Sequence, residues 1–161
     1  MKVVINTGPL LFLSKINRLP ILQKFGRIFV PKGVISEIKY KQDDVLKAVT
    51  KTLDDCLKIK TVKDIDLLNV LMKELNGGEA EVISLAIEQK ADWVILDDQD
   101  ARRFAHRFGL NVIGTLGLLA WAKKKGFIKS LKGEIEKLQK SGFYATASLI
   151  EKLLDEVGES Y

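Results

Sequence analysis

Short apolar runs, rich in β-branched residues, alternate with longer segments of helical spacing, and this alternation limits the folds available to the chain. The runs fall at residues 3–5, 27–30, 93–96 and 111–113, and each is followed by a helical segment. Strands that are apolar on both faces are typical of a parallel sheet covered by helices on both sides. The pattern therefore predicts an α/β fold, with residues 57–62 open between a strand and an extension.

Glycine and asparagine residues indicate where several of the helical segments end. We expect helices at residues 10–24 (interrupted near 18–20), 33–40, 43–54, 64–75, 79–89, 101–108, 115–125, 130–140 and 146–157. Asn76, Gly77 and Gly78 are expected to end the fourth of these, with a glycine supplying the left-handed cap. Gly109 and Gly126 close two later helices.

Length and composition indicate one domain, and we expect it in the cytoplasm. A chain of 161 residues suits a single compact domain, and its only cysteine, Cys56, excludes an intramolecular disulfide. The longest nearly uncharged apolar run spans residues 112–122, short of the roughly 20 that cross a bilayer. No membrane partner is expected.

Positive charge gathers in two places. The chain carries a net charge of +5, and residues 121–140 hold seven basic and two acidic side chains, including Lys123, Lys124 and Lys125. Arg102 and Arg103 form a smaller cluster with Arg107. Such clusters attract phosphate backbones, although a solvated helix surface and a basic helix on a membrane, at 115–125, remain open.

A few acidic and amide side chains lie where a ligand site is expected. Asp97 and Asp98 directly follow an apolar strand, and Asn6 follows the first strand. If the strands at 3–5 and 93–96 are neighbours, these side chains meet at one edge of the sheet, where α/β proteins bind ligands.

Two glutamates can approach that edge from flanking helices: Glu37 and Glu79. Crowded carboxylates repel unless a cation lies among them, and Mg²⁺ and Mn²⁺ prefer oxygen ligands. Taken singly, Glu79 is also explained by the helix dipole, and Asp97 or Asp98 by an ordinary helix cap.

The order of these segments resembles the PIN-domain family. The matching pieces are VVINTGPLLFLSKI, VPKGVISEI, GGEAEVISLAIEQKADWVILDDQDARRFA and NVIGTLGLLAWAKKKGFI. The resemblance covers a core at about residues 1–130, and the tail at about 130–158 is similar to the C-terminal helices of a prokaryotic subfamily with GEAE and LDD signatures. It implies a Rossmann-like, three-layer α/β/α sandwich in a single domain spanning residues 1–161.

The resemblance also implies a function. Typical members are Mg²⁺- or Mn²⁺-dependent ribonucleases, among them the VapC-type toxins of toxin–antitoxin pairs. It implies RNA as substrate, a homodimer, and, for a toxin, a small antitoxin protein as partner. The RNA target, the cut site and the antitoxin's identity lie beyond the sequence.

Site residues carry over position by position. The resemblance assigns catalysis to Asn6, Glu37, Glu79 and Asp98, and metal binding to these four with Asp97. Supporting roles fall to Thr7 and Asp100. The clusters of positive charge, and not the resemblance, assign RNA contacts to Arg102, Arg103, Lys123, Lys124 and Lys125. The sequence leaves open which of Asp97, Asp98 and Asp100 binds the metal. We expect Asp98→Ala to abolish cleavage with little change in melting temperature.

One position departs from the family. Most active PIN nucleases carry aspartate where this chain has Asn6. Asparagine keeps an oxygen ligand but lacks its negative charge. Two functions therefore stay open, a metal-dependent ribonuclease and a catalytically inactive module that binds RNA or protein.

Overall fold

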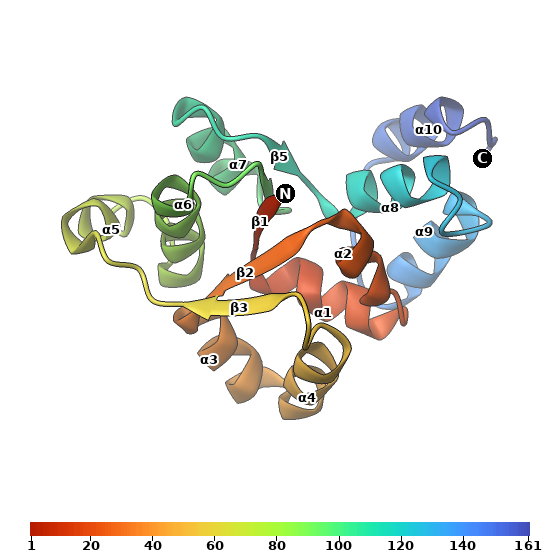
Figure 1. The fold of residues 1–161 in the computed structure, drawn as a ribbon. Helices are drawn as coiled ribbons and strands as arrows, with labels where there is room; N and C mark the ends of the chain where they lie inside the picture. Colours follow the sequence, from red (N-terminus) through yellow and green to blue (C-terminus); the bar gives the residue numbers. More distant parts are fainter.

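A five-stranded parallel sheet forms the centre of the computed structural model, which describes all of residues 1–161. The strand order is β3-β2-β1-β4-β5 (Figure 1). The strands are β1 (Lys2–Ile5), β2 (Arg27–Pro31), β3 (Leu57–Lys60), β4 (Trp93–Ile95) and β5 (Val112–Ile113). Val3, Val4 and Ile5 are fully buried, as predicted for a strand covered on both faces.

Ten helices surround the sheet and complete a three-layer α/β/α sandwich. Figure 1 shows α1 to α4 on one side of the sheet and α5 to α7 on the other. Helices α8 to α10 form a group at the right of the view, next to α2. The helices are α1 (Thr7–Lys15), α2 (Pro20–Phe25), α3 (Lys32–Lys41), α4 (Asp43–Thr52), α5 (Ile65–Leu71), α6 (Gly77–Gln89), α7 (Gln99–Arg107), α8 (Thr115–Lys124), α9 (Leu131–Lys140) and α10 (Ala147–Glu156).

The strand order reverses direction at β1. The chain moves outward from β1 through β2 to β3, and then returns to lay β4 against the other side of β1. Ile5 lies opposite Ile95, and the Asn6 N–H donates to the Ile95 carbonyl at 3.1 Å. The two strands predicted to be neighbours are therefore paired, and the carboxyl ends of such strands are where α/β sheets bind ligands.

Two local predictions are settled by the structure. Residues 57–60 form the edge strand β3, whose Lys58, Ile59 and Lys60 are exposed. The expected glycine cap at 76–78 is wrong, because Gly77 and Gly78 open α6 and neither has a positive φ. Asn76 caps α6, its side chain accepting from the Glu79 N–H at 2.9 Å, so the glycines begin a helix that was expected to start later.

The membrane-surface interpretation of residues 115–125 is not supported by the packing. The apolar residues of α8 are buried against its neighbours, among them Leu116, Leu118, Leu119 and Ala122. A helix that lies on a bilayer needs a free apolar face. No helix of the structure has the length and hydrophobicity needed to cross a membrane.

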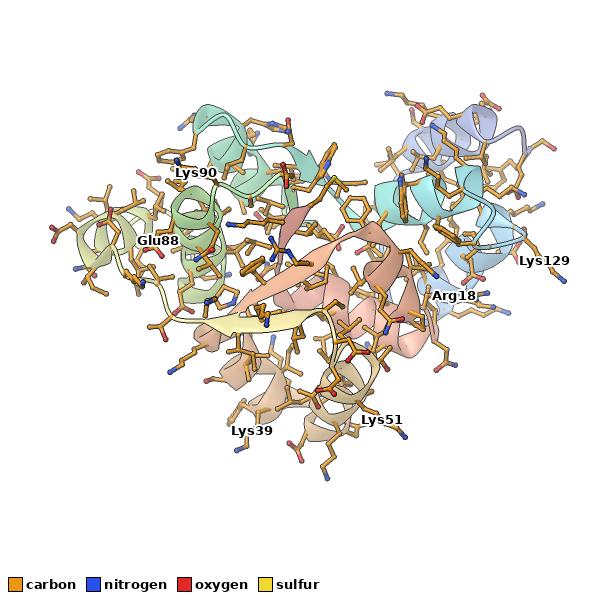
Figure 2. All side chains as sticks on the ribbon, viewed as in Figure 1. Arg18, Lys39, Lys51, Glu88, Lys90 and Lys129 are labelled. Carbon is orange, nitrogen blue, oxygen red and sulfur yellow. The ribbon has the colours of Figure 1, made fainter.

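The C-terminal helices are attached to the rest of the chain through a buried ion pair. Arg18, between α1 and α2, donates to the Glu134 carboxylate of α9 at 2.6 Å, and Glu134 is only 4% exposed. Figure 2 shows Arg18 at the side of the molecule that faces α9. Burial raises the pKa of Glu134, but Arg18 and then Lys137 outweigh it, so the net pKa lies below its ordinary value.

Arg18→Met is expected to lower the free energy of unfolding by about 2–3 kcal/mol at pH 7, because a buried carboxylate loses its main partner. Since the folded-state pKa of Glu134 is depressed, the stabilisation holds above the ordinary glutamate pKa and is lost as the pH falls through the folded value. Urea unfolding at pH 7 and about pH 3 measures this. Arg27→Met, at an exposed arginine, is the control. An equal loss at both pH values would contradict an electrostatic origin.

Candidate active site

The site lies at the carboxyl ends of β1 and β4, beside the first turn of α6. Asn6 precedes α1 but makes no side-chain cap bond, so its amide is free for other partners. Its Oδ1 and the Oε2 of Glu37 lie 3.9 Å and 3.1 Å from the position that a Cβ of Gly78 would take. The sheet and two helices therefore bring Asn6 and Glu37 together, as the sequence predicted.

Glu37 is held by two donors. The Thr7 hydroxyl donates to its Oε2 at 2.9 Å, and the Lys41 ammonium donates to its Oε1 at 2.8 Å. Burial raises the pKa of Glu37, but the bonds from Lys41 and Thr7 outweigh that effect and leave the pKa below its ordinary value. Glu37 is thus ionised at neutral pH, fixed in place, and neutralised by its neighbour one turn along α3.

Glu79 and Asp98 form a pair of like charge. Glu79, in the first turn of α6, is 8% exposed. Burial raises the pKa of Glu79, and the neighbouring carboxylate of Asp98 raises it further. The Glu79 backbone N–H is already used by Asn76, and no cationic side chain is within ion-pair distance of either carboxylate.

Asp98 also has a structural role. Its Oδ1 accepts from the Ala101 N–H at 2.9 Å and caps α7. Asp98 is therefore a helix cap and also a candidate site residue. An alanine at this position removes the cap and costs about 1 kcal/mol, whereas asparagine is as good a cap as aspartate. Asp98→Asn is thus a cleaner variant than Asp98→Ala for separating chemistry from stability.

Asp97 faces a different element. Its carboxylate accepts from the Thr115 N–H at 2.8 Å and from the Thr115 hydroxyl at 2.6 Å, at the start of α8. Asp100 is exposed and paired with Arg103. No group of three or more Asp, Glu, His or Cys side chains lies close enough to hold one metal ion. The five predicted ligands thus divide into Asn6 with Glu37, Glu79 with Asp98, and a separate Asp97.

The basic side chains predicted to contact RNA lie in two separate parts of the fold. A Cβ on Gly114 would lie 2.8 Å from Nη1 of Arg102 and 2.9 Å from Oδ1 of Asp97, so Arg102 lies near Asp97 at the start of α8. Arg102 forms no ion pair. Lys123, Lys124 and Lys125 lie at the far end of α8, about 15 Å along the helix from Thr115.

Two of those three lysines already have anionic partners. Lys123 pairs with Glu159 at 3.6 Å and Lys124 with Glu156 at 3.9 Å. The carboxylate of Glu159 also accepts from the Leu131 N–H at 2.7 Å, at the start of α9. The structure therefore places Arg102 near Asp97 and puts the lysine cluster at the attachment of the C-terminal segment.

Sequence reasoning missed Lys41, Thr115 and the tight approach at Gly78. Lys41 follows Glu37 at the i,i+4 spacing of a helical ion pair, which is a readable signal. The partnership of Thr115 with Asp97 joins residues 18 positions apart, and no local pattern announces it.

Comparison with known proteins identifies the class. Residues 2–159 match a family profile described as PIN domain. The chain belongs to the PIN-domain family, whose members are generally nucleases that act on RNA or DNA and use divalent metal ions.

A solved structure agrees on the fold. The chain is similar to a PilT N-terminus domain protein from the hyperthermophilic archaeon Sulfolobus solfataricus P2, at 22% identity and a TM-score of 0.52. The likeness covers 76% of this chain and 93% of that one, and at this identity it shows the fold alone. The comparison with curated protein sequences found no match.

Glu79→Gln is expected to stabilise the metal-free chain at pH 7. Because the folded-state pKa of Glu79 is raised, its carboxyl favours folding below the ordinary glutamate pKa, and this contribution is lost as the pH rises through the folded value. The gain from Glu79→Gln should vanish near pH 4, where both side chains are neutral. Urea unfolding in EDTA measures it, with the exposed Glu151→Gln as control. Destabilisation at pH 7 would contradict the raised pKa.

Proposed function

We propose that the chain is a Mg²⁺- or Mn²⁺-dependent endoribonuclease that cleaves RNA at the carboxyl ends of β1 and β4. The observation that carries this proposal is the Glu79–Asp98 pair. A buried carboxylate beside a second one, with no cationic side chain to offset them, is a site that a divalent cation stabilises.

The donor set fits such an ion. Mg²⁺ in nucleic-acid enzymes is commonly held by one or two carboxylates, with waters and substrate phosphate completing its shell. Glu79 and Asp98 would supply the carboxylates, while Asn6 and Glu37 lie across the Gly78 turn as further oxygen donors. When bound, the ion supplies an activated water and offsets charge on the scissile phosphate.

The chain's own side chains would orient the substrate. Arg102, which lies near Asp97 and forms no ion pair, would bind a backbone phosphate. Thr7 and Lys41 keep the Glu37 carboxylate ionised and in one orientation. Lys123, Lys124 and Lys125 would contact only RNA that extends well beyond the site.

A second function is favoured by the charge balance of the site. Asn6 leaves the first strand without the usual aspartate, and Lys41 neutralises Glu37, so the site holds less free negative charge than its number of acids indicates. A PIN fold that binds RNA or a protein without cutting it is consistent with that balance.

We extend the first proposal to the toxin of a toxin–antitoxin pair, acting in the cytoplasm as a homodimer with a small antitoxin as partner. The resemblance of the sequence to VapC-type toxins is the support for this extension. Co-purification with the product of a neighbouring gene and the mass of the purified protein in solution test it.

Cleavage of a pooled RNA library tests the ribonuclease directly. Wild type should cut single-stranded and hairpin RNAs with Mn²⁺ and not with EDTA. Asp98→Asn should lose roughly 100-fold or more, since even residues behind the ligands cost 10–100-fold. Its melting temperature should stay near wild type because asparagine keeps the α7 cap. Cleavage unchanged in Asp98→Asn would mean that the activity is a contaminant.

Asn6→Asp distinguishes the two functions. The added carboxylate faces Glu37, so the metal-free chain should be destabilised, while Mn²⁺ affinity should rise by on the order of tenfold. Thermal unfolding with and without Mn²⁺ measures both effects. Cleavage gained by this variant from an inactive wild type would establish the binding module, and a Mn²⁺ response no larger than wild type would contradict a metal site at Asn6.

A further inference from the structure

Helices α3 and α6 meet through two glycine–glutamate contacts that run in opposite directions. Glu81 of α6 lies over Gly33 of α3, and Glu37 of α3 lies against Gly78 of α6. A Cβ on Gly33 would be only 1.6 Å from Oε2 and 2.6 Å from Cδ of Glu81. Gly33 has no positive φ, so glycine is needed there for space and not for backbone conformation.

The start of α3 lacks a conventional cap. Pro31 holds the cap position and offers no side-chain bond to the first turn. The free N–H groups at a helix start attract an anion, and the Glu81 carboxylate lies over this start, against Gly33.

The contact joins the two halves of the candidate site. Glu79 lies two residues before Glu81 on α6, and Glu37 lies four residues after Gly33, about one turn along α3. A shift of α3 against α6 would move Glu37 away from Gly78 and change its distance to the Glu79–Asp98 pair.

We propose that Glu81 is a positioning residue whose carboxylate, seated over Gly33, sets the spacing between the two halves of the metal site. This inference rests on the function proposed above. It gives the second glutamate of the GEAE segment a role distinct from that of Glu79, which faces the site itself.

The test combines Mn²⁺ binding, measured by calorimetry without RNA, with cleavage kinetics and urea unfolding. Glu81→Ala should weaken Mn²⁺ binding and lower kcat on the order of 10- to 100-fold, with the KM for RNA little changed, as for residues that orient metal ligands. Gly33→Ala should do the same, because its Cβ displaces the Glu81 side chain. Glu81→Gln keeps an acceptor of the same shape and should restore most of the affinity.

The double variant Gly33→Ala/Glu81→Ala separates positioning from folding. The methyl group enters the space left by the carboxylate, so the urea midpoint should recover from that of Gly33→Ala toward that of Glu81→Ala, while Mn²⁺ affinity stays low. Recovery of Mn²⁺ affinity in the double variant would overturn the proposal, because filled space alone would then suffice.

Glu88→Ala is the matched control. Glu88 is also on α6, and its carboxylate accepts from the Lys63 and Asp64 N–H groups, at 2.7 and 2.6 Å, just before α5. Figure 2 shows it between α5 and α6, away from α3. Its loss should lower stability and leave Mn²⁺ affinity unchanged.

The outcomes separate the two proposals. Wild-type Mn²⁺ affinity and kcat in Glu81→Ala, with wild type active, would overturn the positioning role alone. Absence of Mn²⁺ binding by wild type would overturn the metal-dependent function, and the positioning role with it.

Discussion

The pairing of β1 with β4 brings the candidate site together. It joins strands about ninety residues apart, with Val3 opposite Trp93 and Ile5 opposite Ile95. A parallel pair of this kind requires a long crossover, which here includes β2, β3 and the helices between them. Once the pairing is formed, the residues that follow both strands emerge at the same edge. Asn6, Asp97 and Asp98 owe their places at this edge to this register, since a shift of one residue would turn them to the opposite face.

The carboxylates near this edge have different partners, because several of them bind the starts of different helices. Asp98 caps α7, Asp97 is bonded to the first residue of α8, and Glu81 lies over the start of α3. Glu79 is buried with Asp98 beside it, and its pKa is raised first by burial and then by that carboxylate. Helix N-termini stabilise carboxylates. The same contacts therefore hold the helices in place and fix the carboxylates near this edge.

Charge balance at the site depends on Asn6 and Lys41. Asparagine in place of the family's aspartate removes one negative charge, and Lys41 neutralises that of Glu37. The free anionic character is thus concentrated on Glu79 and Asp98. Under the proposed function, this arrangement would suit an ion that keeps much of its water, and the charge at position 6 would control how tightly the ion is held.

The sequence by itself determined four of the five strands, nearly every helix and the polar residues that follow β1 and β4, because apolar periodicity and strand ends are local signals. It misplaced Gly77 and Gly78, since two glycines after a helix and two glycines before one look alike until Asn76 is seen to cap α6. Only the tertiary structure decided which acid does what. Glu79 and Glu81 stand two residues apart in one segment, and the packing of α6 sends one to Asp98 and the other over Gly33. That division depends on contacts between helices far apart in the chain, and no local pattern encodes them.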